Sequence, residues 1–245
     1  MPVIFKSTGN DIFKRSTFMG SYRDSLKRIY NNFESPVASK LFKKILELNE
    51  DETNNEYLSF IDKYIQEFVI GERVKIVRDN EGIGTKVYIL NKGKEVLLAD
   101  MGYGVSQVLP VILQICITAV ENKGTSSQLF LEEPEANLHP ALQSKLADMF
   151  VDAMQRFSIQ FIIETHSEYI IRKLQYLTAR DVIKPSDTCI QYFYPPDNIP
   201  QGEKQVKKIT IDENGVLSDD FGTGFFDEAD NIAISIWNMN HSQKN

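Results

Sequence analysis

The sequence predicts an α/β protein in which helices cover a parallel sheet. An antiparallel β meander and a small helical subdomain are expected in addition. The first observation is an alternation of helical and strand-like apolar segments. We expect helices over 108–120, 141–157 and 168–177, and strands over 129–131 and 159–163. Strands that alternate with helices of this length are typical of a parallel sheet, which binds ligands at the carboxyl ends of its strands.

Two further observations concern the residues before this region. Apolar residues at helical spacing predict two helices that pack as a small subdomain, over 37–48 and 55–68. Three strand-like segments separated by turn residues follow, over 73–77, 85–90 and 95–99. This spacing favours an antiparallel meander. Beyond the parallel region we expect further strands near residues 189–194 and 206–211.

The composition is that of an ordinary globular protein. The 245 residues are 42% hydrophobic and 25% charged, and 27 basic against 34 acidic side chains give a formal net charge of -7. This balance excludes a surface that is basic throughout, so any nucleic-acid contact must be local or shared with a partner. Cys116 and Cys189 lie in apolar stretches, which indicates reduced core residues. We find no signal peptide and no segment approaching the roughly 20 apolar residues of a membrane span, and expect a cytoplasmic protein without a membrane contact.

The strongest functional pattern is LFLEEPEANLHP, residues 129–140. An apolar strand ends there in two adjacent carboxylates, which are tolerated only where the strand leaves the core. This arrangement resembles the Walker B motif of P-loop ATPases, in which the first acid holds magnesium and the second polarises the attacking water. The resemblance makes Glu132 the metal residue, although most relatives have Asp there, and Glu133 the catalytic base. A solvated acidic turn is the alternative.

The segment after these acids, residues 134–138, resembles the D-loop, which crosses the dimer interface in ABC proteins; Asn137 is its candidate nucleotide contact. A second strand then ends at Glu164 and is followed by Thr165-His166-Ser167. This segment resembles the H-loop, and the resemblance makes His166 the histidine that contacts the γ-phosphate. A histidine with a purely structural role is the alternative.

A glycine-containing loop opens the first long apolar helix, in DMGYGVSQVLPVILQI. A helix N-terminus with exposed amides favours an anion, and the loop lies where ABC ATPases carry their signature motif. Its candidate nucleotide contacts are Gly102, Gly104, Ser106 and Gln107. The match is partial, because Val105 and Ser106 occupy positions that are usually glycine, and a plain helix cap is the alternative.

Signature, Walker B, D-loop and H-loop follow one another in the order of ABC-class ATPases. The sequence resembles bacterial ATPases of the overcoming-lysogenization, RecF and chromosome-maintenance kind, and within them proteins whose last module is similar to ITIDENGVLSDDFGTGFFDEADN. The resemblance implies a partial P-loop NTPase sheet of the ABC type, with ATP and Mg²⁺ as cofactors. It also implies three regions: a remnant of the first lobe with a helical insertion over 1–70, the ATPase core over 71–195, and the C-terminal module over 196–245.

The phosphate-binding pattern Gly-x-x-x-x-Gly-Lys-Ser/Thr occurs nowhere in the sequence, and the nearest string, GNDIFKRS, lacks the second glycine. Arg23 in FMGSYR is a candidate phosphate contact, with a plain surface arginine as the alternative. The first functional hypothesis is therefore an ATPase module, of a DNA-repair or phage-defence type, that a P-loop-containing chain or a homodimer completes. The second is a non-catalytic or regulatory subunit that only dimerises or binds a partner. A nuclease is disfavoured, because no Asp-x-Asp with an upstream glutamate follows residue 170.

Overall fold

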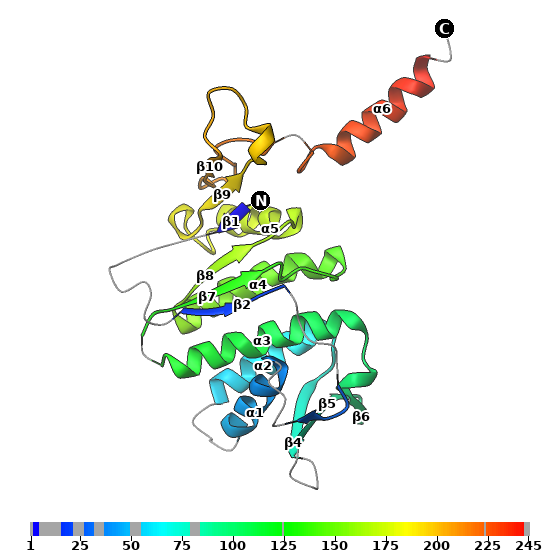
Figure 1. Cartoon of the computed structure of the whole chain (residues 1–245), viewed down its shortest axis with the longest axis vertical. Helices are drawn as coiled ribbons and strands as arrows, with labels where there is room; N and C mark the ends of the chain where they lie inside the picture. Colours follow the sequence, from blue (N-terminus) through cyan, green and yellow to red (C-terminus); the bar gives the residue numbers. More distant parts are fainter. Residues whose placement is uncertain are drawn as a thin grey trace.

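The computed structural model describes residues 2–4, 16–21, 27–31, 37–49, 55–78, 84–123, 125–222 and 224–242. Two sheets, six α-helices and three short 3-10 helices make up this part of the chain (Figure 1). The strands are β1 (Pro2–Ile4), β2 (Ser16–Met19), β3 (Tyr30–Asn31), β4 (Arg73–Arg78), β5 (Gly84–Asn91), β6 (Lys94–Leu97), β7 (Ser127–Glu132), β8 (Ile159–Glu164), β9 (Ile190–Phe193) and β10 (Val206–Ile209). The helices are α1 (Val37–Asn49), α2 (Asn55–Glu67), α3 (Tyr103–Glu121), α4 (Pro140–Phe157), α5 (Glu168–Ala179) and α6 (Glu228–Ser242).

The central sheet has six strands in the order β10-β9-β1-β8-β7-β2. Strands β2, β7 and β8 run parallel, whereas β1 pairs antiparallel with both β8 and β9. Glu132 lies opposite Glu164 in the β7–β8 register. The helices and the parallel core confirm the predicted α/β class. The carboxyl ends of β7 and β8 therefore meet at one edge, as expected for a ligand site.

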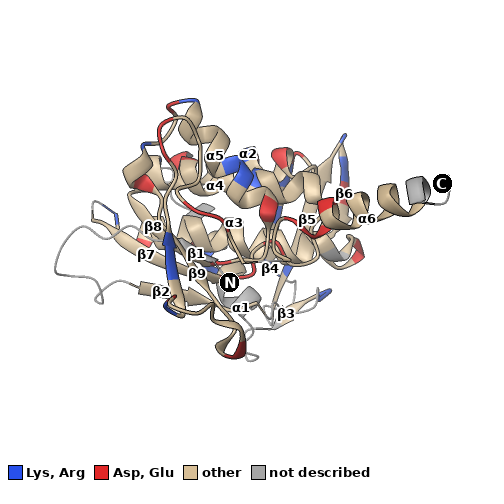
Figure 2. Ribbon diagram, turned by 90° about the horizontal axis from the view of Figure 1, so that it is seen from above, with Lys and Arg blue, Asp and Glu red and all other residues tan. Residues whose placement is uncertain are grey.

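The two faces of the central sheet differ in what covers them. Leu129, Leu131 and Ile163 point into the main core, and the ring of Phe161 lies 5.0 Å from that of Phe150 on α4. Helices α4 and α5 lie on this side of the sheet (Figure 2). The opposite face carries a row of paired apolar residues, Phe18–Phe130–Ile162. These three are outside the main core cluster, and Phe18 is 66% exposed.

The second sheet is the predicted meander. β4 pairs antiparallel with β5, and β5 with β6, across a Lys92-Gly93 turn in which both residues have positive φ. β3, which the sequence did not predict, pairs with the other end of β5. Helices α1 and α2 pack against α3 and against the second sheet and share its core, so the separate helical subdomain stays a prediction. Because β1 and β2 belong to the central sheet, the first 70 residues contribute to both sheets, and the proposed three-region division stays a prediction.

The C-terminal module docks on α5 through its aromatic residues. Phe221, Phe225 and Phe226 stack on one another, with centroids 4.5 to 5.0 Å apart, and Tyr192 of β9 contacts this group. The guanidinium of Arg172 on α5 lies 5.0 Å from the Phe226 ring. Helix α6 then projects away from the rest of the protein (Figure 1).

Helix α3 (Tyr103–Glu121) is longer than the helix predicted over 108–120, and it is highly apolar. Its segment Gly104–Glu121 has a mean hydropathy of 1.6 and, among the described residues, is long and apolar enough to span a membrane. The expectation that no segment comes near this threshold was therefore wrong. The segment is 78% buried inside the protein, and a core helix of this kind has the same composition.

Candidate functional site

The site begins where β7 and β8 leave the core. Glu132 is the last residue of β7 and Glu164 the last of β8, and both are half-buried. Glu133 continues the pairing, because its backbone N–H donates to the Glu164 carbonyl at 2.9 Å. Three carboxylates are thus brought to one edge by the register of two parallel strands.

The turn after β7 is held in a strained conformation. Glu133 has φ of 42° and Asn137 has φ of 60°, a left-handed region that side chains other than glycine adopt at some cost. The Ala136 N–H donates to the Glu133 carbonyl, and the Leu138 N–H donates to the Glu135 carbonyl, both at 3.0 Å. Other non-glycine residues away from this site also have positive φ, among them Val69 and Ser158, so the conformation shows a firmly held turn and does not by itself identify a function.

His166 lies between β8 and α5 and faces this turn. Its Nε2 is 3.9 Å from Oε1 of Glu133, and its side chain is 59% exposed. Ser167 caps α5 by accepting from the Ile170 N–H. One ligand atom from each of Glu133, Glu164 and His166 lies within 4.8 Å of the other two. The structure therefore brings together the predicted base, the predicted histidine and Glu164.

The electrostatics of this edge suit a cation. Burial raises the pKa of Glu164 above its ordinary value, the charges of Glu132 and Glu133 raise it further, and His166 opposes the shift. A divalent cation relieves such repulsion, and carboxylate oxygens are the ligands that Mg²⁺ prefers. The ligand atoms that lie together at this edge belong to Glu133, Glu164 and His166. Glu132, which the sequence pattern assigned to the metal, is outside this group, although its charge acts on Glu164. Carboxylates at this edge suit a divalent cation, and Mg²⁺ at Glu132 stays a prediction.

The turn and the histidine segment are tied together by side chains. Oε1 of Glu135 accepts from the His166 backbone N–H at 2.6 Å. Gln143 on α4 donates to the Leu138 carbonyl at 3.0 Å and accepts from the Ser167 hydroxyl at 2.6 Å. These bonds connect the D-loop-like turn to the H-loop-like segment.

The glycine loop before α3 lies beside the same turn. Gly102 is the exposed N-cap of α3, and a Cβ added to Gly104 would lie 3.7 Å from the Asn137 carbonyl oxygen. The side chains of Ser106 and Gln107, in contrast, are buried, with exposures of 1% and 2%. Gly102, Gly104 and Asn137 thus share one surface, whereas Ser106 and Gln107 point into the protein. Their nucleotide contacts stay predictions.

Several site residues were not assigned roles by the sequence. Glu164 was noticed only as the end of a strand, and Glu135 only as part of the D-loop-like segment. The Ser21 N–H, just after β2, donates to Oε2 of Glu132 at 3.3 Å, so a third parallel strand reaches the same edge. The shared signal is weaker than a motif: each of these residues lies at, or within three residues after, the end of a short strand. Arg23 lies outside the described residues.

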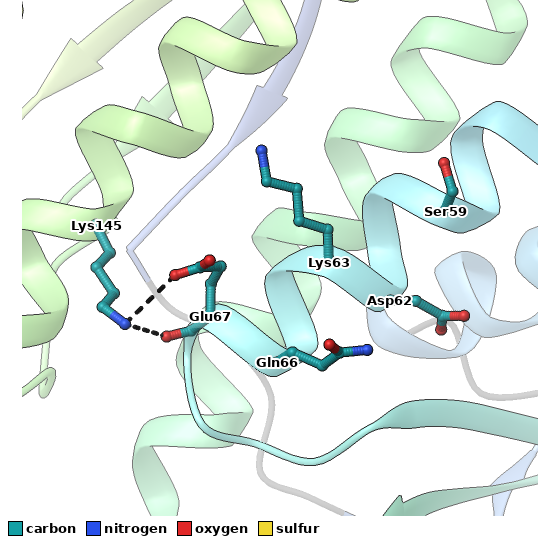
Figure 3. Close-up of a pocket in the computed structure, with 6 residues that line it drawn as sticks. All are labelled: Ser59, Asp62, Lys63, Gln66, Glu67 and Lys145. Carbon is teal, nitrogen blue, oxygen red and sulfur yellow. Dashed lines mark hydrogen bonds and ion pairs between the residues drawn. The ribbon is translucent and has the colours of Figure 1, made fainter.

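A cavity of about 480 Å³ lies elsewhere, between α2 and α4 (Figure 3). Its charged side chains are paired: Lys145 contacts Glu67, Lys63 contacts Asp152, and Asp62 contacts Arg73. Because these pairs balance one another, the cavity offers no net charge to a ligand.

The comparisons with known proteins identify the family of the chain. A family described as "AAA ATPase domain" matches residues 14–171, more than half of the chain. The chain belongs to this ATPase family. A second family, described as "Protein of unknown function (DUF3696)", matches residues 183–233. This match confirms the resemblance to proteins with such a C-terminal segment, whereas the predicted bounds of 196–245 stay a prediction. A search of curated proteins found no match.

Solved structures similar to this chain include Smc proteins. One, from work on ATP-driven dimerization and DNA-stimulated activation of SMC ATPases, is 12% identical, with a TM-score of 0.45; the match covers 66% of this chain and 88% of that one. The Smc heads from Pyrococcus furiosus and Pyrococcus yayanosii are 14% and 13% identical, with TM-scores of 0.38 and 0.37. Each of these two matches covers 48% of this chain. The matched part is 29% of the Pyrococcus furiosus chain and 23% of the Pyrococcus yayanosii chain.

Proposed function

We propose that the chain supplies the Walker B, D-loop, H-loop and signature parts of an ATP-hydrolysing site of the ABC class. The observation that carries this proposal is the convergence of Glu132, Glu133, Glu164 and His166 at the carboxyl ends of β7 and β8. Ligands of open α/β sheets bind at this edge. The AAA ATPase domain match supports the same class of activity.

Each residue has a distinct role in this proposal. Glu132 and Glu164 hold Mg²⁺, which when bound neutralises charge on the β and γ phosphates. Glu133 accepts the proton of the attacking water, and the exposed imidazole of His166, 3.9 Å away, donates a hydrogen bond to the γ-phosphate. Gly102, Gly104 and Asn137 offer backbone and amide groups to the nucleotide of a facing protomer.

The phosphate-binding loop comes, in this proposal, from outside these 245 residues. A P-loop-containing chain, or a homodimer in which further segments take part, completes the site and couples it to a DNA-repair or phage-defence activity. The solved Smc heads include one bound to the C-terminal domain of ScpA and one studied for ATP-driven dimerization. Those titles concern their own proteins and motivate a search for a partner of this chain.

A non-catalytic role is the second candidate, and one observation favours it. The strand beside β8 is β1, which runs antiparallel and places Val3 opposite Glu164. A parallel strand would end at this edge and continue into a strand-to-helix loop. β1 runs in the opposite direction, so its amino end lies at this edge instead. A chain arranged in this way would bind a partner through the turn after β7 without hydrolysing ATP.

Calorimetric titration with Mg-ATP and a phosphate-release assay separate the two candidates. Both measurements are made on the chain alone and after mixing with the product of an adjacent gene that encodes a P-loop. We expect binding and hydrolysis only in the mixture. A mixture that forms a stable complex and still releases no phosphate would favour the regulatory subunit.

A further inference from the structure

The carboxylate of Glu135 differs in its setting from the other acids of the site. Its residue is only 7% exposed, whereas Glu132, Glu133 and Glu164 are half-buried. Oε1 accepts from the backbone N–H of His166 at 2.6 Å, across 31 residues of chain. A hydrogen bond this short is typical of an ionised acceptor, which binds about twice as strongly as a neutral one.

The second oxygen of the same carboxylate has no hydrogen-bond partner among the described residues. Burying a polar oxygen without a partner is unfavourable, and more so when the group is charged. The hydrogen bond of Oε1 must therefore offset the cost of the unpaired oxygen, and a buried polar atom without a partner calls for an explanation.

The geometry of the turn supplies that explanation. Glu135 holds the backbone of His166, and Glu133, two residues earlier, faces its ring at 3.9 Å. Both acids belong to a turn closed by its own backbone hydrogen bonds and strained at Glu133 and Asn137. Among the described residues, a further link through Gln143 reaches Ser167 and not His166.

We propose that Glu135 is a positioning residue that couples the turn after β7 to His166. Because the bond goes to the backbone of His166, a movement of the turn is transmitted to the whole residue rather than to its ring alone. A partner that displaces the turn at Asn137 then moves the imidazole relative to Glu133. The consequence for the γ-phosphate rests on the proposed ATPase site, whereas the coupling itself does not.

The coupling is tested without nucleotide by NMR on the ¹⁵N-labelled chain. In the parent protein the His166 amide proton should lie far downfield and exchange slowly. Glu135→Leu keeps the approximate size and removes the acceptor, so exchange at His166 should accelerate by about 10- to 100-fold, the loss expected for a bond to a charged group. Glu135→Gln keeps an acceptor oxygen without the charge and should give a smaller upfield shift. Glu168→Gln is the matched control, because Glu168 is a nearby acid whose described partner is Arg172.

An unchanged His166 amide in Glu135→Leu, with changes confined to Asn137 and Leu138, would show that Glu135 only shapes its own turn and would overturn the proposal. If Glu135→Leu does not fold, the test is made on Glu135→Gln. An unchanged chemical shift of the His166 amide proton in that variant would also refute the proposal. In a complex that hydrolyses ATP, Glu135→Leu should lower kcat and leave KM for ATP unchanged, and Glu135→Gln should recover part of kcat. The two proposals can fail separately. If the His166 amide changes in Glu135→Leu but no complex of the chain hydrolyses ATP, the coupling is supported and the proposed activity is refuted.

Discussion

Replacing Glu133 by glutamine tests the assignment of the catalytic base. The substitution keeps the shape of the side chain and removes the charge that polarises water. A positioned general base contributes about 10²- to 10⁴-fold to a rate. The Glu133 side chain is 41% exposed, so water screens its charge, and we expect the low end of this range, a fall in kcat of about 10²-fold. That factor corresponds to about 2.7 kcal/mol in the activation free energy.

The assay is phosphate release at saturating Mg-ATP, with binding measured separately by calorimetry, in the complex that contains a phosphate-binding loop. Glu133→Gln should retain ATP binding, whereas the matched variant Glu132→Gln should weaken binding that depends on magnesium. Hydrolysis at the parental rate by Glu133→Gln would show that the base lies elsewhere. The Walker B register would then have to move by a residue.

Three further predictions concern the chain by itself. Mg-ATP should bind weakly, because the sequence lacks the amide cradle and lysine that hold the β and γ phosphates; a submicromolar Kd in calorimetry would contradict this. Glu164→Gln should raise the free energy of unfolding at pH 7 and lose this effect near pH 4, measured by urea denaturation. The pKa of Glu164 is raised in the folded state above its ordinary value of 4.5. At pH values above 4.5 the folded chain therefore binds more protons at this group than the unfolded chain does, and the free energy of unfolding falls as the pH rises through the folded-state pKa. Because Phe18 is an exposed apolar residue on the edge strand β2, we expect the chain to self-associate there. Phe18→Ser should weaken this association on the order of tenfold in sedimentation, and Val69→Ser, at an 81% exposed position elsewhere, is the control and should change little.

Local patterns were enough to predict most of the larger elements. Helices α1, α2, α4 and α5 and strands β4 to β8 all lie within a few residues of the predicted ranges, because each carries its own apolar periodicity. Helix α3 begins at Tyr103, five residues earlier than expected. Gly104, Ser106 and Gln107 interrupt the apolar pattern there, although two of the three are buried.

The short strands could not be predicted in the same way. β1, β2 and β3 have two to four residues each, too few for any periodicity to be visible. β2 is held by pairing with β7, more than a hundred residues further along the chain. Such strands exist because tertiary contacts complete their hydrogen bonds, and the sequence around them contains no signal of that partner.

The candidate site shows the same limit. Glu132, Glu133 and His166 could be found because each follows an apolar strand in a recognisable motif. The part played by Glu164 depends on its register opposite Glu132, and that of Glu135 on its bond to a backbone amide 31 residues away. Both roles depend on contacts between segments that are far apart in the sequence. A single sequence identifies the residues but does not show which of them are in contact.

These pairings also constrain how any partner completes the site. Asn137 lies against Gly104 on one side, and its turn is bonded through Glu135 to His166 on the other. The signature-like loop, the D-loop-like turn and the H-loop-like segment therefore form one connected surface beside the three carboxylates. A phosphate-binding loop arriving from outside must meet the carboxyl edge of β7 and β8 while this surface remains accessible. Because the turn contacts both neighbours, a partner that docked there would act on the histidine and the glycine loop together. In the proposed ATPase site, the turn after β7 is therefore the element through which partner binding would control hydrolysis.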